Sequence, residues 1–149
     1  VAVVHPDVPE PDPQAPILLG IDGSPASEAA TAIAFDAASR RRAPLIAMHA
    51  WENGFTPDVH LGRAAHQASG AEVLSERLAG WQETYPDVPV TPVLIHQDPG
   101  RWLVDQSTSG QLIVVGSRGR GGFAGMLLGS VSSTVVQAAA VPVIVARQP

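Results

Sequence analysis

The sequence predicts an α/β protein in which helices cover both faces of a doubly wound, mainly parallel β-sheet. Two observations lead to this class. Short apolar segments alternate with helical patterns along the chain, and segments rich in small residues follow two of the apolar segments. In sheets of this kind, ligands bind outside the carboxyl ends of the strands, where the strand order reverses. The 149 residues suit one domain with a full hydrophobic core.

The first strand–helix unit lies near the start of the chain. Residues 16–21 form an apolar run that predicts a buried strand. Ser24 and Pro25 then predict the start of a helix, because serine is a preferred N-cap and proline fits the first helical position. We expect the apolar face of this helix to consist of Ala26, Ala29, Ile33 and Ala37.

The middle of the chain continues the alternation. Residues 45–50 predict a second strand, residues 51–65 a loop and residues 68–84 a second helix. The apolar stripe of that helix is expected to contain Leu74, Leu78, Trp81 and Tyr85. A third strand is predicted over residues 88–96, and its two prolines favour an edge position, since proline cannot donate to a neighbouring strand.

The last third supplies two more strands. Asp98 and Pro99 predict the start of a third helix. Residues 112–115 contain no polar side chain, which predicts a central strand covered on both faces. A glycine-rich loop follows, and then a fourth helix over residues 130–139 and a last strand over residues 142–146.

Composition excludes several classes of protein. The net charge is −5, and all nine basic residues are arginine. We therefore expect neither a nucleic-acid partner nor an anionic membrane, both of which favour basic proteins; the single RGRGG run at residues 118–122 is weak evidence against this. The absence of cysteine excludes disulfides and thiol catalysis. No apolar run is long enough for a membrane span or a signal peptide, so we expect a cytoplasmic location.

The glycine-rich loop is the most informative segment. Its glycines are Gly116, Gly119, Gly121, Gly122, Gly125 and Gly129. Such a run lets backbone N–H groups approach an anion, and the helix that begins at Ser130 adds free N–H donors and a positive dipole end. The hydroxyls of Ser130, Ser132 and Ser133 and the charges of Arg118 and Arg120 could assist. This pattern predicts a phosphate site, although a flexible surface loop is the alternative; no Walker lysine is present.

At these residues the chain resembles a known family. Gly116, Gly119, Gly129 and Ser130 match the G-x2-G-x9-G-[ST] signature of ATP-binding universal stress proteins. Residues 20–24, 96–99 and 138–147 also resemble, in order, the first strand–turn, the third strand–turn–helix and the closing helix and strand of that family. The resemblance extends over residues 16–147.

The resemblance implies a Rossmann-like, five-stranded sheet in the order 3-2-1-4-5, which would bind ATP or a related adenine nucleotide. Asp22 would bond the adenosine part, the backbone of Ala50 would meet the adenine edge, and the glycine-rich loop would hold ribose and phosphates. Mg²⁺ would bridge the phosphates without dedicated protein ligands. The candidate site residues are Gly20, Ile21, Asp22, Ala50, Gly116, Arg118, Gly119, Gly129, Ser130, Val131 and Ser132.

The family and the residues together suggest a regulatory nucleotide-binding protein of the universal stress response without substantial turnover. A slow ATPase or nucleotide hydrolase, a cyclic AMP binder and a nucleotide-independent interaction domain remain alternatives. Asp22 could instead act as a cap beside Ser24, and His49 is expected to be a satisfied core residue rather than a base. A catalytic triad of Ser24, His49 and Asp22 is not expected, because the chain lacks the G-x-S-x-G elbow. A metal site at the loop residues His60 and His66 is not expected either, because they lack a carboxylate partner for a metal.

The domain boundary is expected between residues 15 and 16. Residues 1–15 are rich in proline and predict an extended segment, whereas residues 16–149 form the nucleotide-binding domain. Val1–Val4 resemble the closing strand of the same family, so the chain could be the second half of a tandem protein; an ordinary extension is the alternative. The tandem interpretation predicts that Val1–Val4 pair with an exposed edge, such as that of the last strand. Family members also usually dimerise through that strand, which predicts a homodimer or an equivalent domain pair.

Overall fold

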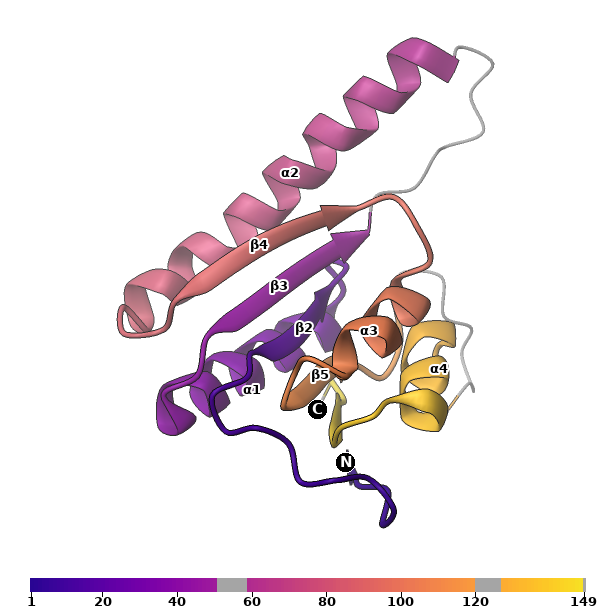
Figure 1. Cartoon of the computed structure of the whole chain (residues 1–149). Coiled ribbons are helices and arrows are strands. Elements are labelled where there is room, and N and C mark those ends of the chain that lie inside the picture. Colours follow the sequence, from indigo (N-terminus) through magenta and orange to yellow (C-terminus); the bar gives the residue numbers. More distant parts are fainter. Residues whose placement is uncertain (51–58, 120–126, 149) are drawn as a thin grey trace.

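A computed structural model describes residues 1–50, 59–119 and 127–148, with the side chains of residues 59–69 and 73 left undescribed. The strands are β1 Ala2–Val3, β2 Ile17–Ile21, β3 Leu45–Ala50, β4 Val90–Ile95, β5 Leu112–Gly116 and β6 Val143–Ala146. The helices are α1 Pro25–Arg41, α2 Val59–Thr84, α3 Pro99–Ser107 and α4 Ser130–Ala138. Strands and helices alternate from β2 onward, as the sequence predicts (Figure 1).

The six strands form one sheet in the order β1-β6-β5-β2-β3-β4. Every neighbouring pair from β6 to β4 is parallel, whereas β1 runs antiparallel to β6. The expected five-stranded sheet is therefore corrected to a six-stranded one, and the difference is the added strand β1. The strand order reverses between β2 and β5, because the chain leaves β2 toward β3 on one side and returns to β5 on the other.

The sheet separates two hydrophobic layers. Ile17 and Leu19 pack with buried residues of α1 and α2, while Leu18 lies between them in sequence and packs with residues of α3 and α4 on the opposite face. This alternation follows from the two-residue period of a strand. Figure 1 shows α1 and α2 on one side of the sheet and α3 and α4 on the other, so the prediction of helices on both faces is confirmed.

Helix α1 begins as predicted, and its expected apolar face is confirmed in part. Ser24 is its N-cap and accepts a hydrogen bond from the N–H of Ser27, and Pro25 occupies the first helical position. The buried residues are Ala26, Ser27, Ala30, Thr31, Ala34, Phe35 and Ala38. Of the expected face, Ala26 is buried and Ala29 and Ala37 pack against the core, but Ile33 is 36% exposed, whereas Phe35 is fully buried.

Helix α2 is longer than predicted. It begins at Val59, so residues 59–65 of the loop expected over residues 51–65 belong to a helix, as does the neighbouring His66. Residues 51–58 lie outside the described part. The predicted stripe is confirmed, since Leu74 and Leu78 are buried and Trp81 and Tyr85 pack against the same core. Phe35 of α1 contacts both rings, with centroid distances of 5.9 Å to Trp81 and 5.8 Å to Tyr85.

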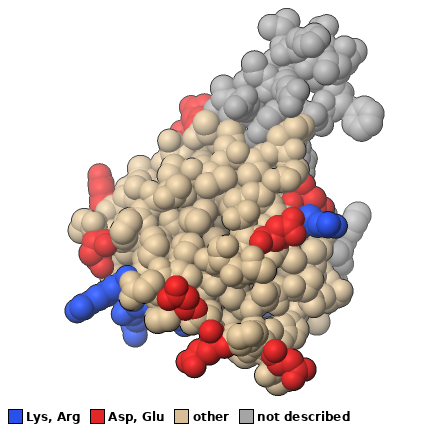
Figure 2. All heavy atoms as spheres, in the orientation of Figure 1, with Lys and Arg blue, Asp and Glu red and all other residues tan. Residues whose placement is uncertain are grey.

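The predicted positions of two strands are confirmed. β4, which contains Pro92, lies at the edge of the sheet, and β5 lies between β2 and β6 with its first four residues buried. No helix among the described residues is both long and apolar enough to cross a membrane. On the face seen in Figure 2, few basic side chains of the described residues are visible, and acidic side chains lie close to them.

Strand β1 covers the outer edge of β6. Ala2 pairs with Ile144 and Val3 with Val143, and Val145 exchanges two backbone hydrogen bonds with Val1. The expectation that Val1–Val4 pair with the edge of the last strand is thus confirmed for Ala2–Val3. The same contacts place β1 on the edge through which a homodimer or an equivalent domain pair is expected to form.

The segment between β1 and β2 is also fastened to the domain. His5 lies with Nε2 2.7 Å from the carbonyl oxygen of Val136 in α4. The side-chain amide of Gln111 donates to the carbonyls of Pro13 and Ala15 at 2.9 and 2.7 Å. The extended proline-rich segment therefore lies along the domain with both of its ends hydrogen-bonded to it.

Candidate functional site

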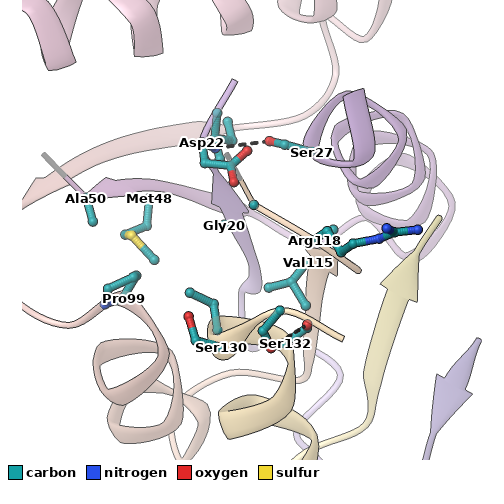
Figure 3. Close-up of a pocket in the computed structure, with 15 residues that line it drawn as sticks. Gly20, Asp22, Ser27, Met48, Ala50, Pro99, Val115, Arg118, Ser130 and Ser132 are labelled. Carbon is teal, nitrogen blue, oxygen red and sulfur yellow. Dashed lines mark hydrogen bonds between the residues drawn. The ribbon is translucent and has the colours of Figure 1, made fainter. Parts of the chain in front are cut away.

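A cavity lies at the carboxyl ends of β2 and β5, where the strand order reverses (Figure 3). The empty space is about 570 Å³, part of it open to solvent. The eleven candidate site residues named from the sequence all line it, so residues of both segments rich in small residues meet at one cavity. The cavity is lined by Gly20, Ile21, Asp22, Ser27, Met48, Ala50, Pro99, Val115, Gly116, Arg118, Gly119, Gly129, Ser130, Val131 and Ser132.

Sequence patterns missed four of these residues. Ser27 belongs to the first turn of α1, Met48 and Val115 to strands, and Pro99 to the start of α3. None of the four belongs to a polar motif. Only their positions, one or two residues from a strand end or at a helix start, could have indicated that they line the cavity. Met48, Pro99 and Val115 give the cavity an apolar wall that an aromatic base could contact.

Asp22 connects the first strand–turn to the glycine-rich loop. Its Oδ1 accepts a hydrogen bond from the N–H of Ser24 at 2.8 Å, and its own N–H donates to Oγ of Ser27 at 3.1 Å. Its Oδ2 lies 2.7 Å from the point that a Cβ on residue 119 would occupy. The helix cap is Ser24, not Asp22, so the carboxylate keeps Oδ2 at the cavity, directly against the backbone of Gly119.

Gly116 is needed for packing. A Cβ at this position would lie 2.8 Å from the carbonyl carbon of Ala26 and 2.9 Å from the amide nitrogen of Ser27. Both atoms belong to the backbone of α1 and cannot move aside cheaply. The glycine therefore allows the end of β5 to approach the first turn of α1, and this approach brings the two loops of the site together.

Helix α4 presents its N-terminus to the cavity. Gly129 is the N-cap and provides no side chain, while its N–H donates to the carbonyl of Ser117 at 2.6 Å. Among the described residues, the N–H groups of Ser130, Val131 and Ser132 have no acceptor. Free amides at the positive end of a helix suit an anion.

The serines at this helix start have different roles. The hydroxyl of Ser132 is buried and donates to the carbonyls of Ser117 and Gly129, at 3.0 and 3.2 Å. That hydroxyl is therefore engaged by the backbone, which corrects the expectation that it donates to a ligand. Ser130 is exposed and lines the cavity, whereas Ser133 does not line it.

Arg118 lines the cavity, but its side chain points away from the other labelled residues (Figure 3). The guanidinium is thus not directed at Asp22 or Ser130. Arg120, Gly121, Gly122 and Gly125, and also Trp51 beside the end of β3, lie outside the described residues.

The histidine and hydroxyl groups near the site do not form a catalytic set. His49 is buried with Nδ1 2.7 Å from the carbonyl oxygen of Ile21, so this nitrogen donates, and the expected satisfied core histidine is confirmed. The Ser24 hydroxyl donates to the carbonyl of Arg118. Ser24, His49 and Asp22 therefore do not form a triad. In the described part of the chain, no three His, Asp or Glu side chains are grouped as metal ligands.

The fold and the site define a class: an α/β protein with a ligand cavity at the switch point of a parallel sheet, lined by a glycine-rich loop and a helix N-terminus. Residues 15–147 match the model of the universal stress protein family, and the chain belongs to this family. A universal stress protein of Mycobacterium tuberculosis is 60% identical over 99% of this chain. The chain spans about half the length of the curated relatives it matches, 51% in that case.

Solved structures of the same family share the fold. The universal stress protein UspA of Lactobacillus plantarum is similar with a TM-score of 0.76 and 24% identity, over 90% of this chain and 98% of that one. A universal stress protein in complex with cAMP has a TM-score of 0.70 and 24% identity, over 91% and 98%. A family protein of Arabidopsis thaliana with AMP bound has a TM-score of 0.65 and 16% identity, over 91% and 92%.

Proposed function

We propose that this domain is an adenine-nucleotide-binding regulatory module of the stress response, in the ATP-binding subclass of its family, and that it works without substantial turnover. The single observation that carries the proposal is the convergence of Asp22, Gly119 and the N-terminus of α4 on one cavity at the sheet's switch point. Structural neighbours with cAMP or AMP bound support the class of ligand.

Each part of the cavity suits one part of a nucleotide. The free N–H groups of Ser130, Val131 and Ser132 would receive phosphate oxygens. Oδ2 of Asp22 would accept from a ribose hydroxyl, and the backbone end of β3 at Ala50 would face the base beside Met48. Gly20 and Ile21 form the floor at the end of β2.

Mg²⁺ would accompany a nucleotide with two or three phosphates. The donor set fits an ion held mainly by the phosphates, since Asp22 is the one acidic side chain among the described residues that line the cavity. The positive charge of Mg²⁺ would offset the negative charge of the phosphates. The side chain of Arg118 is directed elsewhere and does not supply this charge.

Binding without turnover is favoured over hydrolysis because no described side chain near the phosphate end is placed as a general base. Asp22 lies against Gly119 and His49 is hydrogen-bonded to Ile21. A slow ATPase or nucleotide hydrolase is the main alternative; cyclic AMP binding and a nucleotide-independent interaction domain are the others.

Calorimetric titration with ATP, ADP, AMP and cyclic AMP, together with a phosphate-release assay, separates these functions. We expect saturable binding that Asp22→Ala weakens, and no phosphate release above the protein-free background. Turnover that is lost in Asp22→Ala would establish the hydrolase instead. No binding of any of the four at millimolar concentration would leave the interaction domain.

We propose further that the domain is one half of a two-domain protein and that β1 is the end of the last strand of a preceding domain of the same kind. The relatives are about twice as long as this chain, and β1 pairs antiparallel with the closing strand β6. In this arrangement the preceding domain takes the place of the second copy in a homodimer. An antibody against residues 16–149 should detect an endogenous protein of about twice 15.5 kDa; a band near 15.5 kDa would contradict the proposal.

A further inference from the structure

We propose a second ligand site, for a diphosphate anion, in a separate cavity beside the nucleotide site. This cavity lies between the start of α1, the end of β5 and the residues that follow β6, and its empty space is about 1030 Å³, part of it open to solvent. Its polar lining includes Ser24, Ser117, Arg118, Arg147 and Gln148. We call it the anion cavity.

The charge of the anion cavity differs from that of the whole chain. Two arginines and no acidic residue are among the described residues that line it, although the chain carries a net charge of −5. Two like charges that face one space repel each other, and an anion between them removes the repulsion and adds attraction. This local excess of positive charge is the first observation that points to an anionic ligand.

Neither arginine is engaged elsewhere in the described part of the chain. The ion pairs found there join Arg40 to Asp36, Arg77 to Glu28 and Arg101 to Asp105, so Arg118 and Arg147 have no carboxylate partner among these residues. The side chains of both are exposed and able to bind a ligand. The side chain of Arg118 also points away from the nucleotide cavity (Figure 3), and Arg118 is among the residues that line the anion cavity.

The polar groups at the start of α1 support the arginines. The N–H of Ser27 is bonded to Oγ of Ser24 and that of Glu28 to the Ser24 carbonyl. Pro25 has no N–H, so Ala26 supplies the one amide of this turn without an acceptor among the described residues, and Ala26 lines the cavity. The positive end of a 17-residue helix thus adds to the field of the two guanidinium groups.

The ligand class follows from these donors. Guanidinium groups bind phosphate oxygens through two parallel hydrogen bonds, and two of them suit a diphosphate better than a monophosphate. The diphosphate could be free pyrophosphate or the terminal phosphates of a nucleotide, and the two sources share this chemistry. Because Arg118 and Gly119 line both cavities, a ligand in the anion cavity would lie next to residues that also line the nucleotide cavity.

Titration of inorganic pyrophosphate into the protein tests the proposal, with AMP as the reporter for the nucleotide cavity. Arg147→Gln changes a residue that lines only the anion cavity, and Arg101→Gln removes the same charge from α3 as a control. We expect pyrophosphate affinity to fall about tenfold in Arg147→Gln, as loss of a charge-assisted hydrogen bond implies, and to stay unchanged in Arg101→Gln. AMP affinity should be unaffected in both variants.

Two arms distinguish the sources of the diphosphate. If pyrophosphate binds equally well to free and AMP-saturated protein, the anion cavity is an independent site. If Arg147→Gln lowers the affinity for ATP about tenfold but leaves the affinity for AMP unchanged, the terminal phosphates of ATP reach the anion cavity. Three results overturn the proposal. AMP displaces pyrophosphate while the affinity for ATP is unchanged in Arg147→Gln; Arg147→Gln and Arg101→Gln weaken pyrophosphate binding equally; or pyrophosphate shows no saturable binding at millimolar concentration. The thermal midpoint of Arg147→Gln, with Arg147→Lys as a second variant, verifies that the fold is intact.

Discussion

Oδ2 of Asp22 lies 2.7 Å from the point that a Cβ on Gly119 would occupy. Ninety-seven positions separate the two residues in the chain, yet the switch point of the sheet brings the end of β2 and the loop after β5 into direct contact. A side chain at position 119 would therefore force a shift of the Asp22 carboxylate, whose Oδ1 accepts a hydrogen bond from the N–H of Ser24, or of the loop. The contact also places the acidic side chain and the glycine-rich loop on one wall of the cavity.

Gly119→Ala should therefore separate binding from folding. The added methyl group forces Asp22 or the loop to shift, which we expect to weaken adenine-nucleotide binding about tenfold or more, since overpacking typically costs about 1–3 kcal/mol. Gly80→Ala is the matched control: it lies at an exposed position of α2, with nothing within 4 Å of the point that its Cβ would occupy. It should keep full affinity and gain about 0.5–1 kcal/mol of stability. Equal affinity in the two variants would show that the Asp22–Gly119 contact is not part of the ligand site.

Gly116→Ala should act mainly on stability. Its Cβ would lie 2.8 Å from the backbone carbonyl carbon of Ala26, and neither β5 nor α1 can move without disturbing the core. We expect the free energy of unfolding to fall by about 1–3 kcal/mol. Urea denaturation of the variant measures this change. A variant as stable as the parent would mean that α1 and β5 can move apart at little cost.

Ser132→Ala and Ser130→Ala should give opposite results. The Ser132 hydroxyl is buried and bonded to the carbonyls of Ser117 and Gly129, so its loss should lower stability by about 1 kcal/mol and leave nucleotide affinity nearly unchanged. Ser130 is exposed at the helix start, so its loss should lower affinity with little effect on stability. Thermal unfolding and calorimetry on both variants decide the roles, and the reverse pattern would assign the Ser132 hydroxyl to the ligand.

Removal of residues 1–5 should uncover the edge of β6. The deletion eliminates the pairing of Ala2–Val3 with Val143 and Ile144 and the contact of His5 with Val136. An unpaired edge strand is a ready partner for another chain, so we expect the truncated protein to self-associate more strongly. Analytical ultracentrifugation of both forms at equal concentration measures the change. An unaltered association state after truncation would show that this edge does not govern pairing.

Much of the fold could be predicted from the sequence because its signals are local. The apolar run of residues 112–115 predicts the central strand β5, and the two prolines in residues 88–96 predict the edge strand β4. Ser24 and Pro25 begin α1 as expected. The buried stripe of α1 could be predicted only in part, because most of its candidates are alanines and periodicity alone does not choose between neighbouring faces. Phe35, which packs against Trp81 and Tyr85 from α2, decides the rotation through a tertiary contact.

The candidate site was predictable where chemistry lies in a motif and not where it depends on packing. Asp22, Gly119 and Ser130 follow from spacing and from the family resemblance, and they line one cavity. Met48, Pro99 and Val115 complete its apolar wall; nothing in the sequence distinguishes Met48 and Val115 from core residues, and Pro99 indicates only a helix start. The engagement of the Ser132 hydroxyl by two carbonyls and the direction of the Arg118 side chain also required the three-dimensional structure.

Calorimetric titration of nucleotide-free protein with ATP and AMP, run in parallel on Gly119→Val and Gly80→Ala, tests the central claim most directly. We predict saturable binding of one nucleotide per domain, loss of binding in Gly119→Val because its side chain would enter the space of Asp22, and full binding in Gly80→Ala. Nucleotide binding that survives unchanged in Gly119→Val, or that is absent from the parent protein at millimolar concentration, would contradict the assignment of this cavity to an adenine nucleotide.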